Sequence, residues 1–188
     1  MDTPPEECFD ALTRLAAQTV GAPTAILSLV DSDRQFFKSV FPVGGGVTPG
    51  WHKLGETFCH LVVQKGEAVT VSDWANERPL EGQEIHAGSY AGVPLANDRG
   101  SIVGTLCVID VTPRAWTRRE LDTLYAFAHA AVAEIQRRVA ERATHDTQLR
   151  LVAERTLAHA VQHQMPVGVV VAESPSGRLI SVNAQMTA

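Results

Sequence analysis

The chain has 188 residues, with 16 lysines and arginines against 21 acidic residues, and its net charge of −5 argues against the basic surface that nucleic-acid binding requires. Its 45% hydrophobic and 20% charged residues are typical of a globular protein with one good core. No window approaches the run of about 18 apolar residues that spans a membrane, so we expect a cytoplasmic location and no membrane contact in this segment.

The first third of the chain predicts a helix followed by a β-hairpin. Apolar residues recur at helical spacing from Pro5 to Val20, and Gly21 stands where a left-handed C-cap glycine is expected. Two β-rich runs, residues 24–31 and 35–41, flank the polar letters "SDR", which is the pattern of a hairpin with a short loop.

The middle of the chain predicts a loop, a short helix and three more strands. A glycine- and proline-rich loop over residues 42–56 precedes a helix over 58–64 and a short strand over 68–71. After an irregular polar stretch, strands over 89–96 and 101–110 are joined by "NDRG", whose Asn, Asp and Gly favour a tight hairpin turn.

From Thr117 a long helical pattern begins, with Thr117 and Glu120 spaced as a capping box. The polar letters "THDTQ" at 144–148 interrupt its apolar stripe, which leaves open either two helices or one coiled coil with a phase shift. After Pro166 the pattern changes to strand, turn and strand. Two strands cannot bury a core, so we expect the chain to end inside a second domain.

Five segments, in order, closely resemble a GAF domain of the bacterial signalling type: "AILSLVDSDRQFFKS", "TFCHLVV", "AVTVSDWANERP", "YAGVPL" and "GTLCVID". "MPVGVVVAESPSGRLISVNAQ" resembles the start of a PAS domain. The resemblance implies an α+β fold, with an antiparallel sheet, the terminal helices on one face and a ligand-sized cavity on the other. It also implies a GAF domain over 5–138, a helical linker over 139–164 and a truncated PAS domain over 165–188.

Family members that attach a bilin carry a Cys-His pair on the helix just before the strand that corresponds to "YAGVPL". Here "ERPLEGQEIHAGS" stands in that place and contains no cysteine, while Cys59-His60 lies much earlier. We therefore expect neither bilin nor haem, for which no axial-ligand motif is present. No C-x-x-C or H-x-x-x-H anchor supports a metal site among the nearby candidates His52, Cys59, His60 and His86.

An unknown small molecule is the expected ligand, and we expect no catalytic residue. The candidate wall combines aromatic side chains with a few polar anchors, the usual composition of a small-molecule site. Asp73 and Trp74 each have a structural alternative, as the N-cap of a short helix and as a lid on the core, and Cys59 has one as a packing residue. The candidate ligand-binding residues are Phe37, Trp51, Phe58, Cys59, Asp73, Trp74, Tyr90 and Pro94.

Together the two resemblances imply the N-terminal sensory portion of a histidine kinase, a diguanylate cyclase or a regulated phosphatase. The long helix predicts a parallel homodimer that relays the signal. Two alternatives stay open. A GAF-fold free methionine sulfoxide reductase would need two of Cys8, Cys59 and Cys107 within disulfide reach. A ligand-free dimerisation module would have a cavity filled by its own side chains.

Overall fold

The computed structural model divides into two compact units, Met1–Gln136 and Arg137–Ala188. Among the residues it describes, no helix is both long enough and apolar enough to cross a membrane. It describes residues 6–31, 34–42, 47, 49–53, 58–77, 87–164 and 170–182, with the backbone alone for 159–164, 170, 181 and 182.

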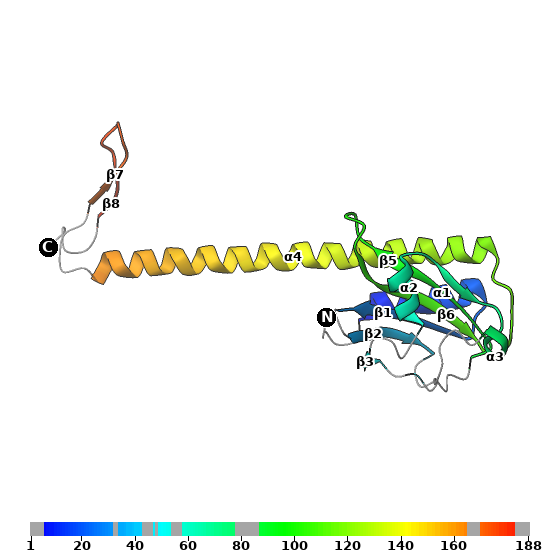
Figure 1. The fold of residues 1–188 in the computed structure, drawn as a ribbon. Helices are drawn as coiled ribbons and strands as arrows, with labels where there is room; N and C mark the ends of the chain where they lie inside the picture. The colour runs from blue at the N-terminus through cyan, green and yellow to red at the C-terminus, as the bar shows by residue number, and fades with distance from the viewer. Residues whose placement is uncertain are drawn as a thin grey trace. The chain divides into compact units, whose positions relative to one another are not determined.

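Six antiparallel strands form one sheet in the first unit, in the order β3-β2-β1-β6-β5-β4 (Figure 1). The two predicted hairpins are confirmed, because β1 pairs with β2 and β5 pairs with β6. The strands are β1 (Thr24–Val30), β2 (Arg34–Phe41), β3 (Gly50–Lys53), β4 (Val69–Val71), β5 (Ser89–Ala96) and β6 (Ile102–Asp110).

Strand β3 lies within the segment 42–56, for which we expected a loop. It pairs with β2 from Arg34 opposite Lys53 to Phe37 opposite Gly50, at one edge of the sheet. Its four residues follow a glycine- and proline-rich stretch with weak strand propensity. Pairing with β2 therefore outweighs local preference, as is common for edge strands.

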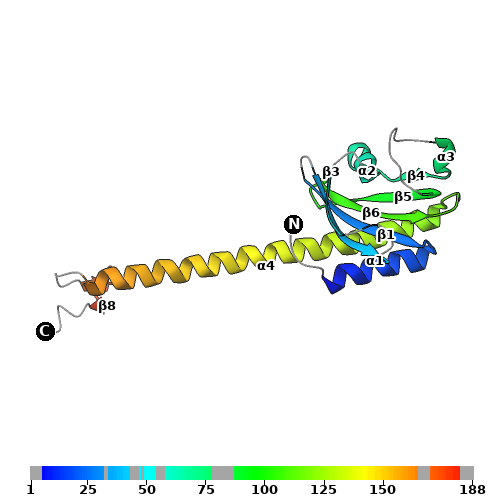
Figure 2. The same ribbon diagram turned by 90° about the horizontal axis from the view of Figure 1, so that it is seen from below.

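The helices divide between the two faces of this sheet (Figure 2). Helix α1 (Glu7–Val20) and the first part of α4 (Arg118–Gln164) pack on one face, while α2 (Cys59–Lys65) and α3 (Trp74–Glu77) lie over the other. Gly21 ends α1 with φ 71°, the left-handed C-cap that the sequence predicts. The α+β layout and the placement of the terminal helices on one face are thus confirmed.

Each face of the sheet has its own core, and alternation along β5 shows how they separate. Ala91, Val93 and Leu95 belong to the core under α1 and α4, whereas Tyr90 belongs to the core under α2. The first core is apolar and closely packed; Leu95 in it is fully buried, and such a side chain contributes about 1.5–3 kcal/mol. The second core is the more mixed in chemistry, and it holds most of the candidate site.

Helix α4 is continuous through residues 144–148, so the polar letters mark no break. The hydroxyls of Thr144 and Thr147 donate to the carbonyls of Ala140 and Ala143, one turn back, which satisfies them within the helix. The predicted capping box is also confirmed.

Contact between α4 and the first core ends at about Ile135, which is partly buried against it. Every residue from 139 to 158 is exposed, including Val139, Leu149, Val152 and Leu157. This stretch of helix therefore covers no core among the residues that the structure describes.

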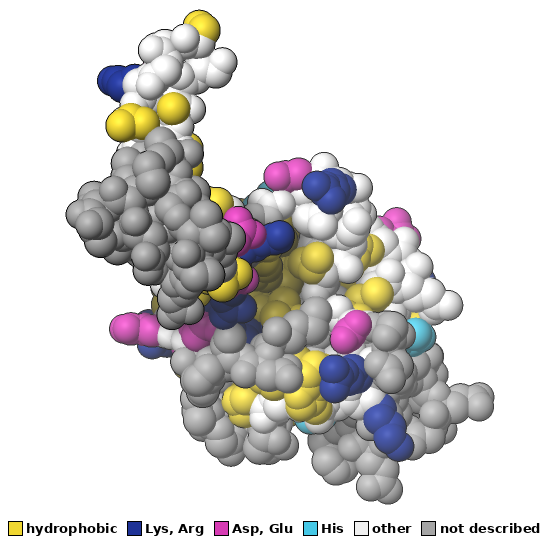
Figure 3. Space-filling model, turned by 90° about the vertical axis from the view of Figure 1, so that its left-hand side faces the viewer, with side chains coloured by type: hydrophobic (Ala, Val, Ile, Leu, Met, Phe, Trp, Pro, Cys, Tyr) yellow, Lys and Arg dark blue, Asp and Glu magenta, His cyan; other side chains and the backbone are white. Residues whose placement is uncertain are grey.

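The second unit contains the rest of α4 and a two-stranded antiparallel sheet of β7 (Val170–Ala172) and β8 (Leu179–Val182). Leu179 and Ile180 are more than 60% exposed, at 62% and 63%. Figure 3 shows hydrophobic side chains at the surface of this hairpin, at the top of the view. Such a hairpin has no core of its own to stabilise it.

Removing residues 165–188 is expected to shift the melting temperature of the first unit by no more than a few degrees, because its core ends near Ile135. Circular dichroism of the full chain and the truncated chain measures this. A truncation after Thr117 is the control, and it should abolish cooperative unfolding because it deletes Leu124 and Ala128 from the core. A large shift on removing 165–188 alone would show that the hairpin stabilises the first unit or a partner.

Candidate functional site

The α2-face cluster is the buried group of side chains between the sheet and helices α2 and α3. Its buried members come from five strands, β1, β2, β4, β5 and β6, and from α2 with the residue before it. Side chains alternate between faces along each strand, so that Phe37, Tyr90 and Cys107 point toward α2. The buried members are Ile26, Phe37, Val40, Phe58, Cys59, Val62, Val69, Val71, Tyr90 and Cys107, with Trp74 partly buried against them.

Aromatic rings contact one another within this cluster and at its margin. The Phe58 ring stands edge-on to Trp74, with centroids 3.7 Å apart, and lies 4.7 Å from the ring of Tyr90. Phe37 stacks on His52 at 4.0 Å. Trp74 therefore covers the cluster from α3, as the lid alternative predicted.

The structure brings Pro94 to the floor of the cluster but separates Trp51 from it. Pro94 is buried and pairs with Thr105 of β6, on the same face as Tyr90. Trp51 pairs with Phe36 on the opposite face and is 38% exposed, with the Arg34 guanidinium 3.9 Å above its ring. Its neighbour His52 faces α2 instead, because side chains alternate along β3.

Polar groups in the sheet also belong to this face, and the sequence analysis did not single them out. Ser28 and Thr105 are fully buried and hydrogen-bond to each other at 2.8 Å. Gln35 is fully buried two residues before Phe37, on the same side of β2. Its even spacing from Phe37 is the signal that would have identified it.

Asp73 has the structural role that was its alternative. Its Oδ1 accepts hydrogen bonds from the backbone N–H groups of Ala75 and Asn76, at 3.0 and 3.3 Å, which is the geometry of an N-cap. Glu77 Oε1 accepts from the N–H groups of Ser72 and Asp73 in return. Asp73 thus fixes the short helix that carries Trp74.

Tyr90 is the most unusual polar residue of the cluster. It is 1% exposed, and its hydroxyl oxygen has no hydrogen-bond partner among the described residues. Its ring lies over Gly92, where a Cβ atom would stand 2.2 Å from that oxygen. Burial raises the pKa of Tyr90 well above its ordinary value, and the thiols of Cys107 and Cys59 reinforce the shift. The hydroxyl is therefore neutral, and it faces thiols, which are weak hydrogen-bonding groups, in place of a strong acceptor.

Two of the three cysteines, Cys59 and Cys107, lie in this cluster. Cys59 and Cys107 are 2% and 1% exposed, and all three cysteines are free thiols. The neighbouring Cys59 thiol and burial both raise the pKa of Cys107 well above its ordinary value. Cys8 lies on the other face, where its Sγ approaches the Glu134 carboxylate at 3.8 Å. Buried, protonated thiols are poor nucleophiles.

Residues 4–135, which make up most of the chain, match the GAF domain family. The chain belongs to this family. As a GAF domain it is 29% identical over 136 residues to a cyclic di-GMP phosphodiesterase of Pseudomonas aeruginosa, a match that covers 69% of this chain and 22% of that protein. The chain therefore corresponds to about a fifth of that relative.

Solved structures with the same fold include two further proteins of different function. A domain assigned to a two-component sensor histidine kinase of Sinorhizobium meliloti aligns with a TM-score of 0.60 at 16% identity, covering 77% of this chain and 99% of that one. The type II free methionine-R-sulfoxide reductase of Thermoplasma acidophilum aligns with a TM-score of 0.58 at 15% identity, covering 68% and 89%. At these identities the alignments show the shared fold alone.

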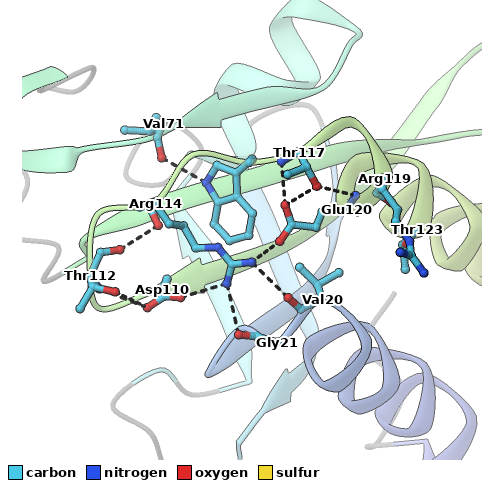
Figure 4. A network of polar contacts seen from close by, with 12 residues as sticks. Val20, Gly21, Val71, Asp110, Thr112, Arg114, Thr117, Arg119, Glu120 and Thr123 are labelled. Atoms are coloured by element: carbon cyan, nitrogen blue, oxygen red, sulfur yellow. Dashed lines mark hydrogen bonds and ion pairs between the residues drawn. The ribbon is translucent and has the colours of Figure 1, made fainter.

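Beside the α2-face cluster, the GAF domain holds a polar junction around Arg114 (Figure 4). The Arg114 guanidinium donates to the carbonyls of Val20 and Gly21 at the end of α1, each at 3.2 Å. It also pairs with the carboxylates of Asp110, at 3.1 Å, and Glu120. Arg114 therefore joins the ends of α1 and β6 to the start of α4.

The carboxylates of this junction are held in the charged form. Burial raises the pKa of Glu120, but hydrogen bonds from Thr117 and Arg114 outweigh burial and leave the pKa below its ordinary value. The same balance holds for Asp110, where Thr112 and Arg114 are the donors. The backbone N–H of Thr117 donates to Glu120 Oε2 at 2.6 Å. The Glu120 side chain therefore both pairs with Arg114 and completes the capping box at the start of α4.

Replacing Tyr90 by Phe is expected to leave the melting temperature unchanged or slightly higher, because the lost hydroxyl has no partner among the described residues. Ser28→Ala is the matched control; it should destabilise the GAF domain by about 1–3 kcal/mol, because it leaves the buried Thr105 hydroxyl without its partner. Chemical denaturation measures both. A loss of stability in Y90F as large as that in S28A would mean that the Tyr90 hydroxyl is satisfied in the folded protein.

Proposed function

We propose that this GAF domain is the sensory part of a bacterial signal-transduction protein and that it binds a small molecule on its α2 face. The observation that supports this most directly is the Tyr90 hydroxyl, which is buried beneath Phe58 with no partner among the described residues. Burying such a group costs free energy unless a partner accepts its hydrogen bond. A bound molecule that presents an acceptor to Tyr90 would recover that cost.

The similar proteins agree with a signalling role. One is a cyclic di-GMP phosphodiesterase of which this chain matches a small part, and another is a domain assigned to a sensor histidine kinase. We infer that the output activity belongs to a further part of the protein, and that residues 165–188 begin a PAS domain. The cytoplasm is the proposed location of the sensor.

Enzymatic reduction of methionine sulfoxide is the competing function, because Cys59 and Cys107 share the cluster. Such chemistry requires a thiolate nucleophile that substrate can reach. The raised pKa of Cys107 keeps it protonated at neutral pH, and both thiols are almost fully buried. We therefore propose a packing role for Cys59 and Cys107 and a non-enzymatic function for this segment.

Native mass spectrometry of freshly purified protein tests ligand binding. We expect a fraction of the wild-type protein to carry one additional organic mass below that of a bilin, with no visible absorption band, and Y90F to carry much less of it. The additional mass should disappear after denaturation, because no covalent attachment is proposed. The proposal would be contradicted if neither wild type nor Y90F carried a bound mass and a metabolite extract gave no thermal stabilisation.

We further propose that α4 forms a parallel homodimer beyond the GAF domain. A long helix gains most of its stability from burying an apolar face, and the exposed Val139, Leu149 and Val152 lie toward one side of α4. A second copy of the same helix is the simplest cover for that side, and parallel alignment would keep the two signalling outputs together.

Leu149→Asp combined with Val152→Asp should convert the dimer to monomer in sedimentation equilibrium without changing the melting temperature of the GAF core. Leu151→Asp is the matched control: Leu151 is also exposed, at 52%, but two residues along a helix lies about 200° around from Leu149, so it should leave the dimer intact. Wild-type protein that is monomeric at high concentration would overturn the dimer proposal. Equal loss of dimer in the L149D/V152D and L151D variants would also overturn it.

A further inference from the structure

The junction around Arg114 has a second side, which faces the α2-face cluster. The backbone N–H of Arg114 donates to the carbonyl of Ser72 at 2.9 Å, and the indole Nε1–H of Trp116 donates to the carbonyl of Val71 at 3.3 Å. Val71 is the last residue of β4, and Ser72 begins the link between β4 and α3. The same short segment that holds the start of α4 therefore also holds the base of the helix that carries Trp74.

We propose that the segment from Asp110 to Thr117, which we call the relay segment, couples the position of Trp74 to the first turn of α4. Arg114 and Trp116 are its positioning residues. The biological role of this coupling rests on the proposed sensory function, in which a bound molecule supplies the signal that moves Trp74. The coupling itself is a property of the protein alone.

On the input side, α3 and its base are tied together. Glu77 Oε1 accepts the N–H groups of Ser72 and Asp73, and Asp73 caps the helix, so a shift of helix α3 as a unit moves this backbone with it. A second series of hydrogen bonds links α3 to the relay segment. Trp74 N donates to Gly88 O at 2.9 Å, and Gly88 N donates to Asp110 O at 2.8 Å. Movement of Trp74 thus reaches both ends of the relay segment.

On the output side, the relay segment is joined to α4 through one carboxylate. Arg114 pairs with Glu120, and Glu120 accepts from the backbone and hydroxyl of Thr117 to form the cap of α4. The Arg114 guanidinium also lies 4.3 Å from the Trp116 ring, so the two positioning residues move together. A displaced relay segment must either break this cap or move the first turn of α4 with it.

The route runs along the ends of β4 and β6 and avoids the interior of the sheet, which is close-packed and resists small displacements. Hydrogen bonds near the surface can be replaced by hydrogen bonds to water, so they rearrange at a smaller cost in free energy. A bound molecule that lifts or presses Trp74 would be read at the start of α4, where a shift or rotation is passed along a continuous helix.

Hydrogen exchange in the absence of any ligand tests the coupling. Trp74→Ala should raise the exchange of amides 118–124, relative to amides of β1, by about threefold or more, because measured couplings of this kind change local equilibria by about two- to thirtyfold. Val62→Ala is the control, since Val62 is fully buried in the same cluster and no hydrogen bond links its side chain to the relay segment. It should leave that ratio unchanged.

Trp116→Phe then tests the route itself, because it removes the indole N–H and keeps an aromatic ring for Arg114. In that background the effect of Trp74→Ala on amides 118–124 should fall to less than half. Equal changes in W74A and V62A, or an undiminished effect of W74A in the W116F background, would overturn the proposal.

A second readout covers the case in which W74A does not fold. With 5-fluorotryptophan at the chain's three tryptophans, Trp74→Phe should shift the fluorine resonance of Trp116 and leave that of Trp51, on the opposite face, in place. An unmoved Trp116 resonance would overturn the coupling. Because no ligand is added, failure to find a bound molecule by mass spectrometry would refute the sensory proposal and leave this result standing.

Discussion

The charge pairing of Arg114 is the interaction on which the arrangement of this domain depends. A single guanidinium joins the end of β6 and the start of α4, which flank Arg114 in the sequence, to the end of α1, which lies 93 and 94 residues earlier at Gly21 and Val20. Its side chain is 25% exposed, so solvent weakens the pairing but does not remove the cost of leaving the carboxylates alone. The terminal helices are held on one face by their apolar cores, and their relative register at this end is held by Arg114.

The two faces of the sheet differ in physical character. Under α1 and α4 the side chains are aliphatic, small and well packed, which gives the sheet a rigid support. Under α2 and α3 the cluster mixes rings, thiols and hydroxyls, and it includes the Tyr90 hydroxyl with its open hydrogen bond.

Local patterns were sufficient to predict much of this fold, including the hairpins, the glycine at the end of α1 and the capping box of α4. What they could not supply is pairing between distant segments. Strand β3 forms only because β2 offers it a partner, and the face that Trp51 occupies follows from its pairing with Phe36. The polar letters around Thr144 left the continuity of α4 open, and the structure settles it because hydroxyls that bond within a helix do not interrupt it.

The candidate site was predictable in its aromatic half and less so in its polar half. Phe37, Phe58, Tyr90 and Trp74 were recognisable by type and by the family resemblance, and the structure gathers them. Gln35, Ser28 and Thr105 read as ordinary strand residues, because burial of a polar group depends on which face it takes. The meeting of Cys59 with Cys107 depends on how α2 lies on β6, which no local pattern encodes.

In the proposed relay along α4, the unbroken course of the helix makes chain length itself a variable of signalling. Each residue of an α-helix turns the chain by about 100°, so one inserted residue would rotate everything that follows by roughly a quarter turn or more, whereas seven would nearly restore the original direction. Angular phase, and not distance alone, is therefore what this helix conveys. Proteins built on the same plan should vary in linker length by steps close to seven, and fusions that ignore this periodicity should lock the output in one state.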